Sequence, residues 1–229
     1  MTGPLAKSEV CVLIPAYNEE KNIGRVVSAV LSRGYAALVV DDGSTDATPE
    51  KIRATGAPAI FSAVNGGKGA SIQKGLERLR ESSYRAAILL DADGQHPIDE
   101  SERFLAALDA GADLVVGNRM ADAKGMPFIR VATNRFMSWL ISSVVGQKVA
   151  DTQCGYRAFS RQAIDKIRLK TARFETESEM IFLAADAGLR IASVPISCVY
   201  GDEVSHIHPV RDTVRFFKFL FRYMASRRT

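Results

Sequence analysis

The sequence predicts an α/β fold in which a mostly parallel central sheet is sandwiched by helices. Two observations lead to this fold class. Short apolar runs rich in Val, Ile and Leu alternate with amphipathic stretches through the first half of the chain, as in βαβ units. These runs are apolar throughout, which is typical of parallel strands buried on both faces. At 229 residues, 47% of them hydrophobic, the chain is long enough to bury such a core.

The expected elements follow one another in a regular order. The predicted strands of the first half are Val10–Ile14, Ala37–Val40, Ala59–Phe61, Ala86–Leu90 and Leu114–Val116. The predicted helices between them cover residues 19–33, 46–55, 68–82 and 98–110. After residue 120 the pattern predicts a long apolar helix over 128–145, a loop over 151–159, a helix that begins near Glu175, a strand at Ile191–Val194 and a basic amphipathic helix over 206–229.

Composition excludes several classes of function. The net charge of +4 is modest and the C-terminal aromatic residues cluster, so nucleic acid is not the expected partner. Three widely spaced cysteines indicate neither a disulfide framework nor a zinc site, which favours a reducing, cytosolic location. The sequence shows neither a signal peptide nor an apolar run of about 18 residues, so no segment is expected to span a membrane.

Two aspartates, Asp91 and Asp93, follow the fourth predicted strand. Two carboxylates about 4 Å apart repel by roughly 4 kcal/mol at an effective dielectric of 20, so Mg²⁺ or Mn²⁺ is their natural companion. One alternative is an acidic turn that caps the next helix. Another is a phosphate hydrolase with an aspartate nucleophile, whose motif also reads Asp-x-Asp-Gly. Gln95 stands where that motif needs Thr or Ser, which disfavours the hydrolase.

Polar motifs also follow the other predicted strands. They are Pro15-Ala-Tyr-Asn-Glu19, Asp41-Asp-Gly-Ser-Thr-Asp46, Asn65-Gly-Gly-Lys-Gly69 and Gly117-Asn-Arg119. Ligands of parallel sheets bind at the carboxyl ends of the strands, so one crevice can collect all of them. The acids at 41 and 42 suit a base edge or ribose hydroxyls. The 65–69 segment lacks the Gly and Ser/Thr of a Walker loop, and a solvated lysine is its alternative. Arg119 suits a phosphate, with a surface arginine as the alternative.

Together these motifs resemble the nucleotide-binding half of inverting, family-2 glycosyltransferases, which have the GT-A (nucleotide-diphospho-sugar transferase) fold. Members show Pro-x-Tyr-Asn-Glu, Asp-Asp-Gly-Ser-x-Asp and Asp-x-Asp in this order. The resemblance implies a metal held by Asp91 and Asp93. It implies that the nucleotide sugar is bound by Pro15, Tyr17, Glu19, Asp42, Lys68, Asp91 and Asp93. It divides a 1–205 glycosyltransferase domain into a nucleotide-sugar half (1–120) and an acceptor half (121–205).

A further motif limits the choice of acceptor substrate. It is the segment Asp151-Thr-Gln-Cys-Gly-Tyr-Arg-Ala-Phe159. It resembles the polyprenyl-phosphate branch of the family, which contains the dolichyl-phosphate mannose synthases. This implies transfer of one sugar, with inversion, from GDP-mannose or a UDP-hexose to dolichyl or undecaprenyl phosphate. The single tryptophan, Trp139, lacks the Gln-x-x-Arg-Trp context of the processive polymer-forming branch. A same-fold transferase to a hydroxyl acceptor and a catalytically silent membrane scaffold are the alternatives.

A phosphate acceptor changes the expected chemistry. A hydroxyl needs a general base, whereas a lipid phosphate is already ionised near pH 7 and mainly needs compensating positive charge. The expected catalytic residues are Asp93, Arg119 and Glu177, although Glu177 is equally well explained as an acid at a helix start. The residues expected to contact the acceptor phosphate are Arg119, Arg130, Gln153, Arg157, His206 and Arg211. His206 stands where the family often has a lysine.

Two helices are expected to face lipid. The 128–145 helix is apolar on every side. In the 206–229 helix, arginines and a lysine interleave with phenylalanines, which is typical of helices lying in an anionic membrane interface. Packing on the core or on a second subunit, in a homodimer, is the alternative. We therefore expect a cytoplasmic protein held peripherally on the cytoplasmic face of the membrane.

Overall fold

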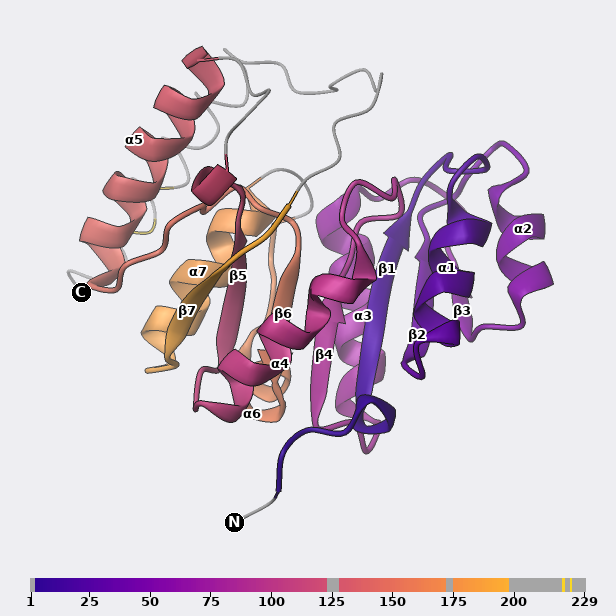
Figure 1. Cartoon of the computed structure of the whole chain (residues 1–229). Helices are drawn as coiled ribbons and strands as arrows, with labels where there is room; N and C mark the ends of the chain where they lie inside the picture. Colours follow the sequence, from indigo (N-terminus) through magenta and orange to yellow (C-terminus); the bar gives the residue numbers. More distant parts are fainter. Residues whose placement is uncertain (1–2, 123–127, 172–174, 198–219, 221–222, 224–229) are drawn as a thin grey trace.

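The computed structural model describes residues 3–122, 128–171, 175–197, 220 and 223. In this part of the chain a seven-stranded sheet has the order β3-β2-β1-β4-β6-β5-β7 (Figure 1). The strands are β1 (Val10–Ala16), β2 (Ala36–Asp41), β3 (Ala59–Phe61), β4 (Ala86–Leu89), β5 (Leu114–Asn118), β6 (Arg157–Ser160) and β7 (Ile191–Pro195). The α-helices are α1 (Ile23–Ser32), α2 (Thr48–Thr55), α3 (Lys68–Arg80), α4 (Ser101–Asp109), α5 (Phe128–Val145), α6 (Arg161–Lys166) and α7 (Thr176–Asp186).

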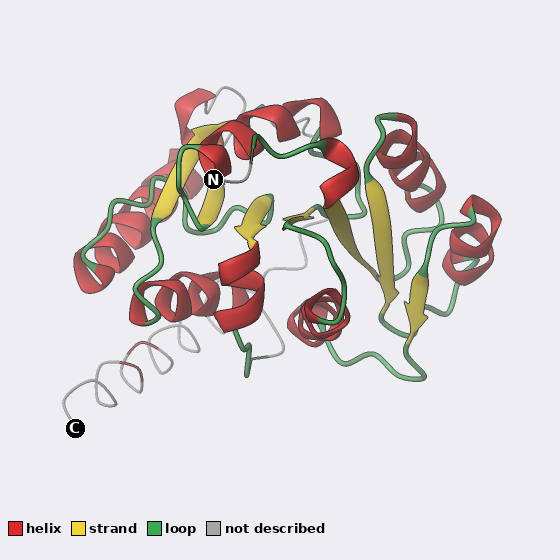
Figure 2. Cartoon of the chain, turned by 90° about the horizontal axis from the view of Figure 1, so that it is seen from below, coloured by secondary structure: helices red, strands yellow, loops and turns green. Residues whose placement is uncertain are grey.

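The helices cover both faces of the sheet, which confirms the predicted α/β class. Figures 1 and 2 show α1 and α4 on one face and α3 on the other. α1 illustrates how apolar residues at helical spacing cover the sheet. Its buried residues are Ile23, Val26, Val27 and Val30. The predicted 128–145 helix has the same bounds as α5.

β6 corrects the prediction that residues 151–159 form a loop throughout. It runs antiparallel to both of its neighbours, β4 and β5, whereas the other strand pairs are parallel. The sequence pattern did not predict this strand because it begins with a charged residue, Arg157, which is fully buried in the structure. The first residue of β6, Arg157, pairs with Leu89 at the end of β4 and with Val116 in the middle of β5.

This arrangement brings the polar segments to one edge. β1, β2, β4 and β5 all point the same way, so the loops that follow them lie at their common carboxyl edge. Because β6 runs the opposite way, the segment that precedes it, residues 151–156, reaches the same edge. The sheet therefore places both predicted halves of the site side by side.

Part of the C-terminal segment packs on the core. Leu220 is buried, and the ring of Tyr223 lies 4.2 Å from that of Phe182 on α7, measured between centroids. The Tyr223 hydroxyl donates a hydrogen bond to Asp186 at 2.6 Å. The remainder of the helix predicted over 206–229 lies outside the described residues, as do His206 and Arg211.

Candidate active site

The loops after β1 and β2 fix each other's shape. The Asn18 side-chain oxygen accepts a hydrogen bond from the Thr45 N–H, and the Asn18 N–H donates to the Ser44 hydroxyl, both at 2.9 Å. A Glu20 carboxylate oxygen accepts from the Ala47 N–H at 3.0 Å. Asn18 has a φ of 53°, a left-handed conformation that asparagine tolerates better than most residues. These motif residues therefore build the rim of the site.

The three residues predicted from the first motif differ in what they offer a nucleotide. Pro15 is buried within β1, where it pairs with Val40. A Glu19 carboxylate oxygen accepts a hydrogen bond from the Asn22 side-chain amide at 3.2 Å. Tyr17, in contrast, is 45% exposed. Among these three, Tyr17 presents the surface on which a ligand ring can lie.

The two acids at the end of β2, Asp41 and Asp42, have separate roles. The Asp42 carboxylate accepts hydrogen bonds from the backbone N–H groups of Gly66 and Gly67, at 3.1 and 2.7 Å, and so holds the turn that begins α3. The predicted nucleotide-binding residue is thus already engaged within the protein. Its neighbour Asp41, absent from the predicted set, is also buried, and its Oδ1 has no hydrogen-bond partner among the described residues. An unsatisfied buried oxygen costs about 1–3 kcal/mol, which favours a ligand that donates to it.

A lysine between two acids forms the centre of the site. The Lys68 ammonium lies 2.7 Å from Asp91 and 3.3 Å from Glu177. Burial alone would lower the Lys68 pKa, but the charges of Asp91 and Glu177 outweigh it and raise that pKa above its ordinary value. For Asp91, burial acts to raise the pKa, and the Lys68 charge outweighs it and lowers the pKa. Lys68 and Asp91 are therefore both charged at neutral pH.

The segment before β6 lies directly against this centre. A Cβ atom on Gly155 would be 2.5 Å from Asp91 Oδ2 and 3.0 Å from Lys68 Nζ, closer than side chains normally pack. Gln153, predicted to contact the acceptor phosphate, is half-buried in the same segment, and its N–H donates to the Asp151 carboxylate at 3.3 Å. The absence of a side chain at Gly155 thus allows the segment before β6 to approach Asp91 and Lys68 closely.

Arg119 is held by Asp151, a residue that the motifs did not mark for this role. The Arg119 side chain donates to both carboxylate oxygens of Asp151, at 2.7 and 3.0 Å, and the Arg119 N–H donates to one of them at 3.2 Å. The Asp151 side chain is fully buried. The Arg119 charge also contributes to lowering the Asp91 pKa, so the structure brings these two predicted residues into electrostatic range.

Arg157 requires a correction, because it was expected to contact an acceptor phosphate. Its side chain is fully buried, and its guanidinium donates to the carbonyl oxygens of Cys154, Glu177 and Thr152 at 2.9, 2.6 and 3.0 Å. These carbonyls satisfy the buried charge. Arg157 therefore joins the 151–156 segment to α7. Arg130, by comparison, is exposed in the first turn of α5.

Two acids on α7 point in different directions because they are two residues apart on a helix. Glu177 reaches Lys68, as described above. Glu179 accepts hydrogen bonds from the N–H groups of Lys170 and Thr171, at 3.0 and 2.9 Å, and from the Thr171 hydroxyl at 2.7 Å. Of this pair, Glu177 therefore belongs to the charged centre and Glu179 anchors the segment before α7.

His96 packs the turn after β4, which contains Asp91 and Asp93, against the 151–156 segment. Its ring stacks on that of Tyr156 with centroids 5.5 Å apart, and burial lowers the His96 pKa. Its Nδ1 is buried without a hydrogen-bond partner among the described residues. Tyr156 directly follows Gly155, so this aromatic contact and the close approach at Gly155 bring the same two segments together.

The oxygen donors at this edge fit a magnesium or manganese ion. The Asp91 side chain is 23% exposed, and Asp93 accepts the Gln95 N–H at 2.9 Å in a tight turn. The described residues contain no cluster of three or more potential His, Cys, Asp or Glu ligands. Mg²⁺ typically uses one or two protein carboxylates and takes its remaining ligands from water and substrate phosphates, which matches this donor set.

Comparisons with known proteins identify the family. The sequence model of the family described as "Glycosyl transferase family 2" matches residues 11–168. An uncharacterized protein of Methanocaldococcus jannaschii is 34% identical, covering 96% of this chain and 93% of the relative. The UDP-N-acetylglucosamine–dolichyl-phosphate N-acetylglucosaminyltransferase of Methanococcus voltae is 31% identical, covering 86% and 88% of the two chains. The undecaprenyl-phosphate mannosyltransferase of Micrococcus luteus is 32% identical, covering 83% of each.

A solved structure shows the same fold. Glucosyl-3-phosphoglycerate synthase from Mycobacterium tuberculosis, in complex with Mn²⁺, uridine diphosphate and phosphoglyceric acid, superposes with a TM-score of 0.70 at 21% identity. The match covers 95% of this chain and 78% of that one. The likeness confirms the GT-A architecture predicted from the motifs.

The first prediction concerns Gly155. Replacing it with alanine should displace the Asp91 carboxylate or the Lys68 ammonium, because the new methyl group meets the ends of these two side chains, and should cost about 1 kcal/mol of unfolding free energy by weakening their contact. Thermal unfolding measures this cost. Gly24→Ala on α1 is the matched control, since a Cβ there meets nothing within 4 Å. Equal melting temperatures for the two variants would contradict the packing described here.

The second prediction concerns Lys68. Lys68→Met should tighten Mn²⁺ binding to the nucleotide-free protein by roughly tenfold, or about 1.4 kcal/mol, because Asp91 then has no competing ammonium. Electron paramagnetic resonance of free Mn²⁺ gives the affinity. Lys74→Met on the same helix is the control, because the Lys74 ammonium contacts Ser62 instead, at 2.7 Å. Weaker Mn²⁺ binding by Lys68→Met alone would rule out the competition.

Proposed function

The chain belongs to glycosyl transferase family 2, and we propose that this glycosyltransferase moves one sugar from a nucleotide-diphosphate sugar to a polyprenyl phosphate, with inversion and with Mg²⁺ or Mn²⁺. One observation carries the proposal. The segment before β6, residues 151–156, which we name the acceptor segment, meets the Lys68–Asp91 centre at Gly155, so a donor diphosphate and an acceptor phosphate can approach at one point. The names of two relatives specify dolichyl-phosphate and undecaprenyl-phosphate substrates, which supports the lipid acceptor.

The donor half suits a nucleoside diphosphate. The exposed Tyr17 ring can pack against the nucleoside, and the unsatisfied Asp41 oxygen can accept a hydrogen bond from it. Lys68 lies at the start of α3, where a helix N-terminus also favours phosphate. A divalent cation bound by Asp91 and Asp93 would neutralise the negative charge that develops on the departing diphosphate. The choice of base and sugar depends on contacts beyond these shared groups.

On the acceptor side of the site, the proposed reaction needs positive charge and no general base. A lipid phosphate attacks as an anion, so its approach to the donor is opposed mainly by charge repulsion. Arg119, oriented by the buried Asp151, reduces that repulsion. Arg157 holds the acceptor segment in place by donating hydrogen bonds to three backbone carbonyls. We assign Glu177 to hold Lys68, which leaves it no separate role as a base.

The proposed acceptor places the reaction at a membrane surface. A polyprenyl chain stays in the bilayer while its phosphate lies at headgroup depth. Among the described residues, no helix has the length and apolar character needed to cross a bilayer. We propose that the enzyme works peripherally, on the cytoplasmic face where nucleotide sugars are available.

The third prediction tests the reaction itself. The full chain is incubated with a panel of GDP- and UDP-sugars, a short-chain polyprenyl phosphate and Mg²⁺ or Mn²⁺, and the lipid product is analysed by mass spectrometry. We expect the acceptor mass to rise by one sugar with one or a few donors. Transfer only to hydroxyl acceptors would favour the same-fold alternative, and metal-dependent nucleotide binding without any transfer would favour a silent scaffold.

The fourth prediction concerns Asp93. Asp93→Asn should lower metal-dependent transfer by roughly 100-fold or more, because a neutral amide stabilises the cation and its diphosphate poorly. Thermal unfolding should remain unchanged, since the amide oxygen can still accept the Gln95 N–H. Asp99→Asn is the matched control, because Asp99 is exposed and paired with Arg33. Undiminished transfer by Asp93→Asn would remove the metal role from this residue.

A further inference from the structure

One face of α5 exposes an unusual amount of apolar surface. Among the described residues, the large apolar side chains on α5 that are exposed are Phe128 at 86%, Ile129 at 77%, Phe136 at 52% and Trp139 at 64%. Phe128, Phe136 and Trp139 are spaced by eight and three residues and therefore share a face. The rings of Phe136 and Trp139 lie 6.1 Å apart. Exposed apolar residues gathered in this way mark an interaction surface.

The opposite face of α5 is bound to the acceptor segment. Its buried residues are Asn134, Ser138, Ile141 and Val145. The Ser138 hydroxyl accepts a hydrogen bond from the Thr152 N–H at 3.0 Å, and the Ser142 hydroxyl accepts one from the Val149 N–H at 2.9 Å. α5 therefore holds the residues on either side of Asp151, the partner of Arg119. A partner that binds the exposed apolar face of α5 would therefore lie one helix away from the acceptor segment.

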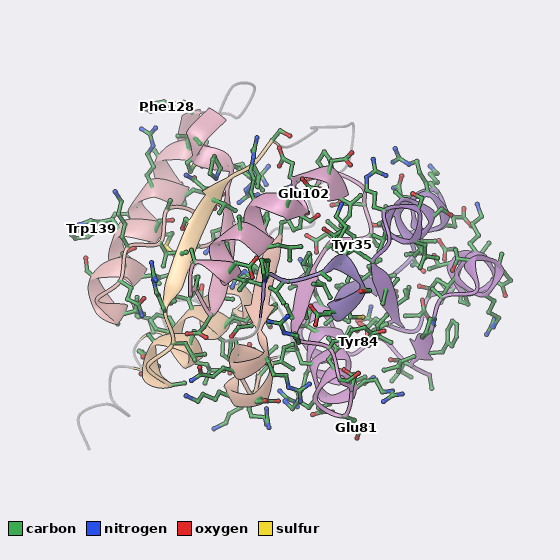
Figure 3. The ribbon with its side chains drawn as sticks, turned by 60° about the horizontal axis from the view of Figure 1, so that its bottom comes forward. Tyr35, Glu81, Tyr84, Glu102, Phe128 and Trp139 are labelled. Atoms are coloured by element: carbon green, nitrogen blue, oxygen red, sulfur yellow. The ribbon has the colours of Figure 1, made fainter. Side chains whose placement is uncertain are left out.

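We propose that this outer face, made by Phe128, Ile129, Phe136 and Trp139, is the surface through which the protein contacts an anionic lipid bilayer. The inference rests on the proposed function, because it identifies where that reaction meets its membrane. Figure 1 shows α5 at the outer side of the molecule, next to the β7 end of the sheet. In Figure 3 the labelled Phe128 and Trp139 lie on this outer helix, away from the body of the protein.

Charge and residue type select a bilayer over a protein partner. α5 carries Arg130 and Arg135, both exposed, and its sequence contains no acidic residue. Arg135 lies four residues before Trp139 and so borders the apolar face, whereas Arg130 lies nearer the opposite side of the helix. Tryptophan and phenylalanine beside an arginine suit the boundary between headgroups and acyl chains, where anionic lipids attract the cation. A helix lying there enters by only about 5–10 Å, which agrees with a helix that does not span the membrane.

This placement has a direct consequence for the acceptor. A polyprenyl phosphate carries its charge at the headgroup level, which is the depth at which α5 would lie. The inner face of the same helix positions the 149–152 segment, so binding to the bilayer brings the acceptor segment to the phosphate without a movement of the fold. The lipid need not leave the membrane to react.

The test uses the fact that Trp139 is the only tryptophan in the chain. The full chain is added to vesicles of phosphatidylcholine alone, of phosphatidylcholine with phosphatidylglycerol, and of the same mixture with brominated acyl chains. We expect a blue shift of the emission on anionic vesicles and quenching by the brominated lipid. Phe128→Ser and Phe136→Ser, which keep the tryptophan, should each weaken vesicle binding by roughly tenfold or more.

A matched control shows whether the α5 face, and not another apolar surface, contacts the lipid. Phe61→Ser applies the same change to an exposed phenylalanine on β3, at the other end of the sheet, and should bind vesicles like the parent chain. Co-sedimentation with vesicles without any change in Trp139 emission would overturn the proposal, since another surface would then contact the lipid. A blue shift that depends on protein concentration without lipid would overturn it in favour of a second copy of the chain.

Activity distinguishes a failure of this inference from a failure of the proposed function. With detergent-solubilised short-chain polyprenyl phosphate, Phe128→Ser and Phe136→Ser should transfer sugar at the parental rate, whereas with acceptor embedded in anionic vesicles they should be slower by the factor lost in binding. Parental rates on vesicles would refute the α5 surface while leaving the reaction intact. A parent chain that transfers nothing in detergent but still shows lipid quenching of Trp139 would refute the reaction and leave the surface.

Discussion

The charged contact of Lys68 with Asp91 and Glu177 is the interaction on which the arrangement of the site depends. It joins the start of α3, the turn after β4 and the first turn of α7, which are far apart in the sequence. The ammonium and the two carboxylates are only partly exposed, at 35%, 23% and 10% for Lys68, Asp91 and Glu177, so each is more stable paired than apart and the contact holds the three elements together. Asp42 fixes the turn before Lys68, and Arg157 fixes the backbone of Glu177, so the neighbouring buried charges serve the same centre. At this centre one ammonium faces two carboxylates, and the pair of Arg119 with Asp151 is neutral, so the protein groups alone leave an excess of negative charge that a divalent cation would offset.

Much of the fold could be predicted from the sequence, because it depends on local pattern. Apolar runs and helix-period stretches predicted β1 to β5 and the helices between them, and the all-round apolar character of residues 128–145 marked α5 to its bounds. β6 was not predicted because it begins with an arginine, which is rarely buried. In the structure three backbone carbonyls accept hydrogen bonds from this arginine, and tertiary contacts bring these carbonyls together. The edge at which the site forms was predictable from strand direction.

The roles of individual residues were less predictable than their location. Asp42, Arg119 and Arg157 lie in motifs that signal ligand binding, yet each is first engaged by protein groups. Conversely, Asp151 acts through a partner that is remote in sequence, which a motif does not display. Asp41 lies in the same motif as Asp42, but only the structure shows that its Oδ1 is buried without a hydrogen-bond partner among the described residues. Charged side chains at strand ends thus divide between those that shape the site and those that face the ligand, and tertiary contacts decide between the two.

The antiparallel strand β6 also bears on how the chain comes to fold during synthesis. β4 pairs with β1 on one side and with β6 on the other, and β6 is completed only at Ser160. Until that residue has left the ribosome, β4 keeps an open, apolar edge, and β5 has no neighbour on its inner side. The halves on either side of residue 120 are therefore interleaved in one sheet, and a nascent chain ending between them would expose an unpaired strand edge that is prone to aggregate. Long-range pairing of this kind favours a single cooperative folding step late in synthesis over stepwise folding of two independent parts.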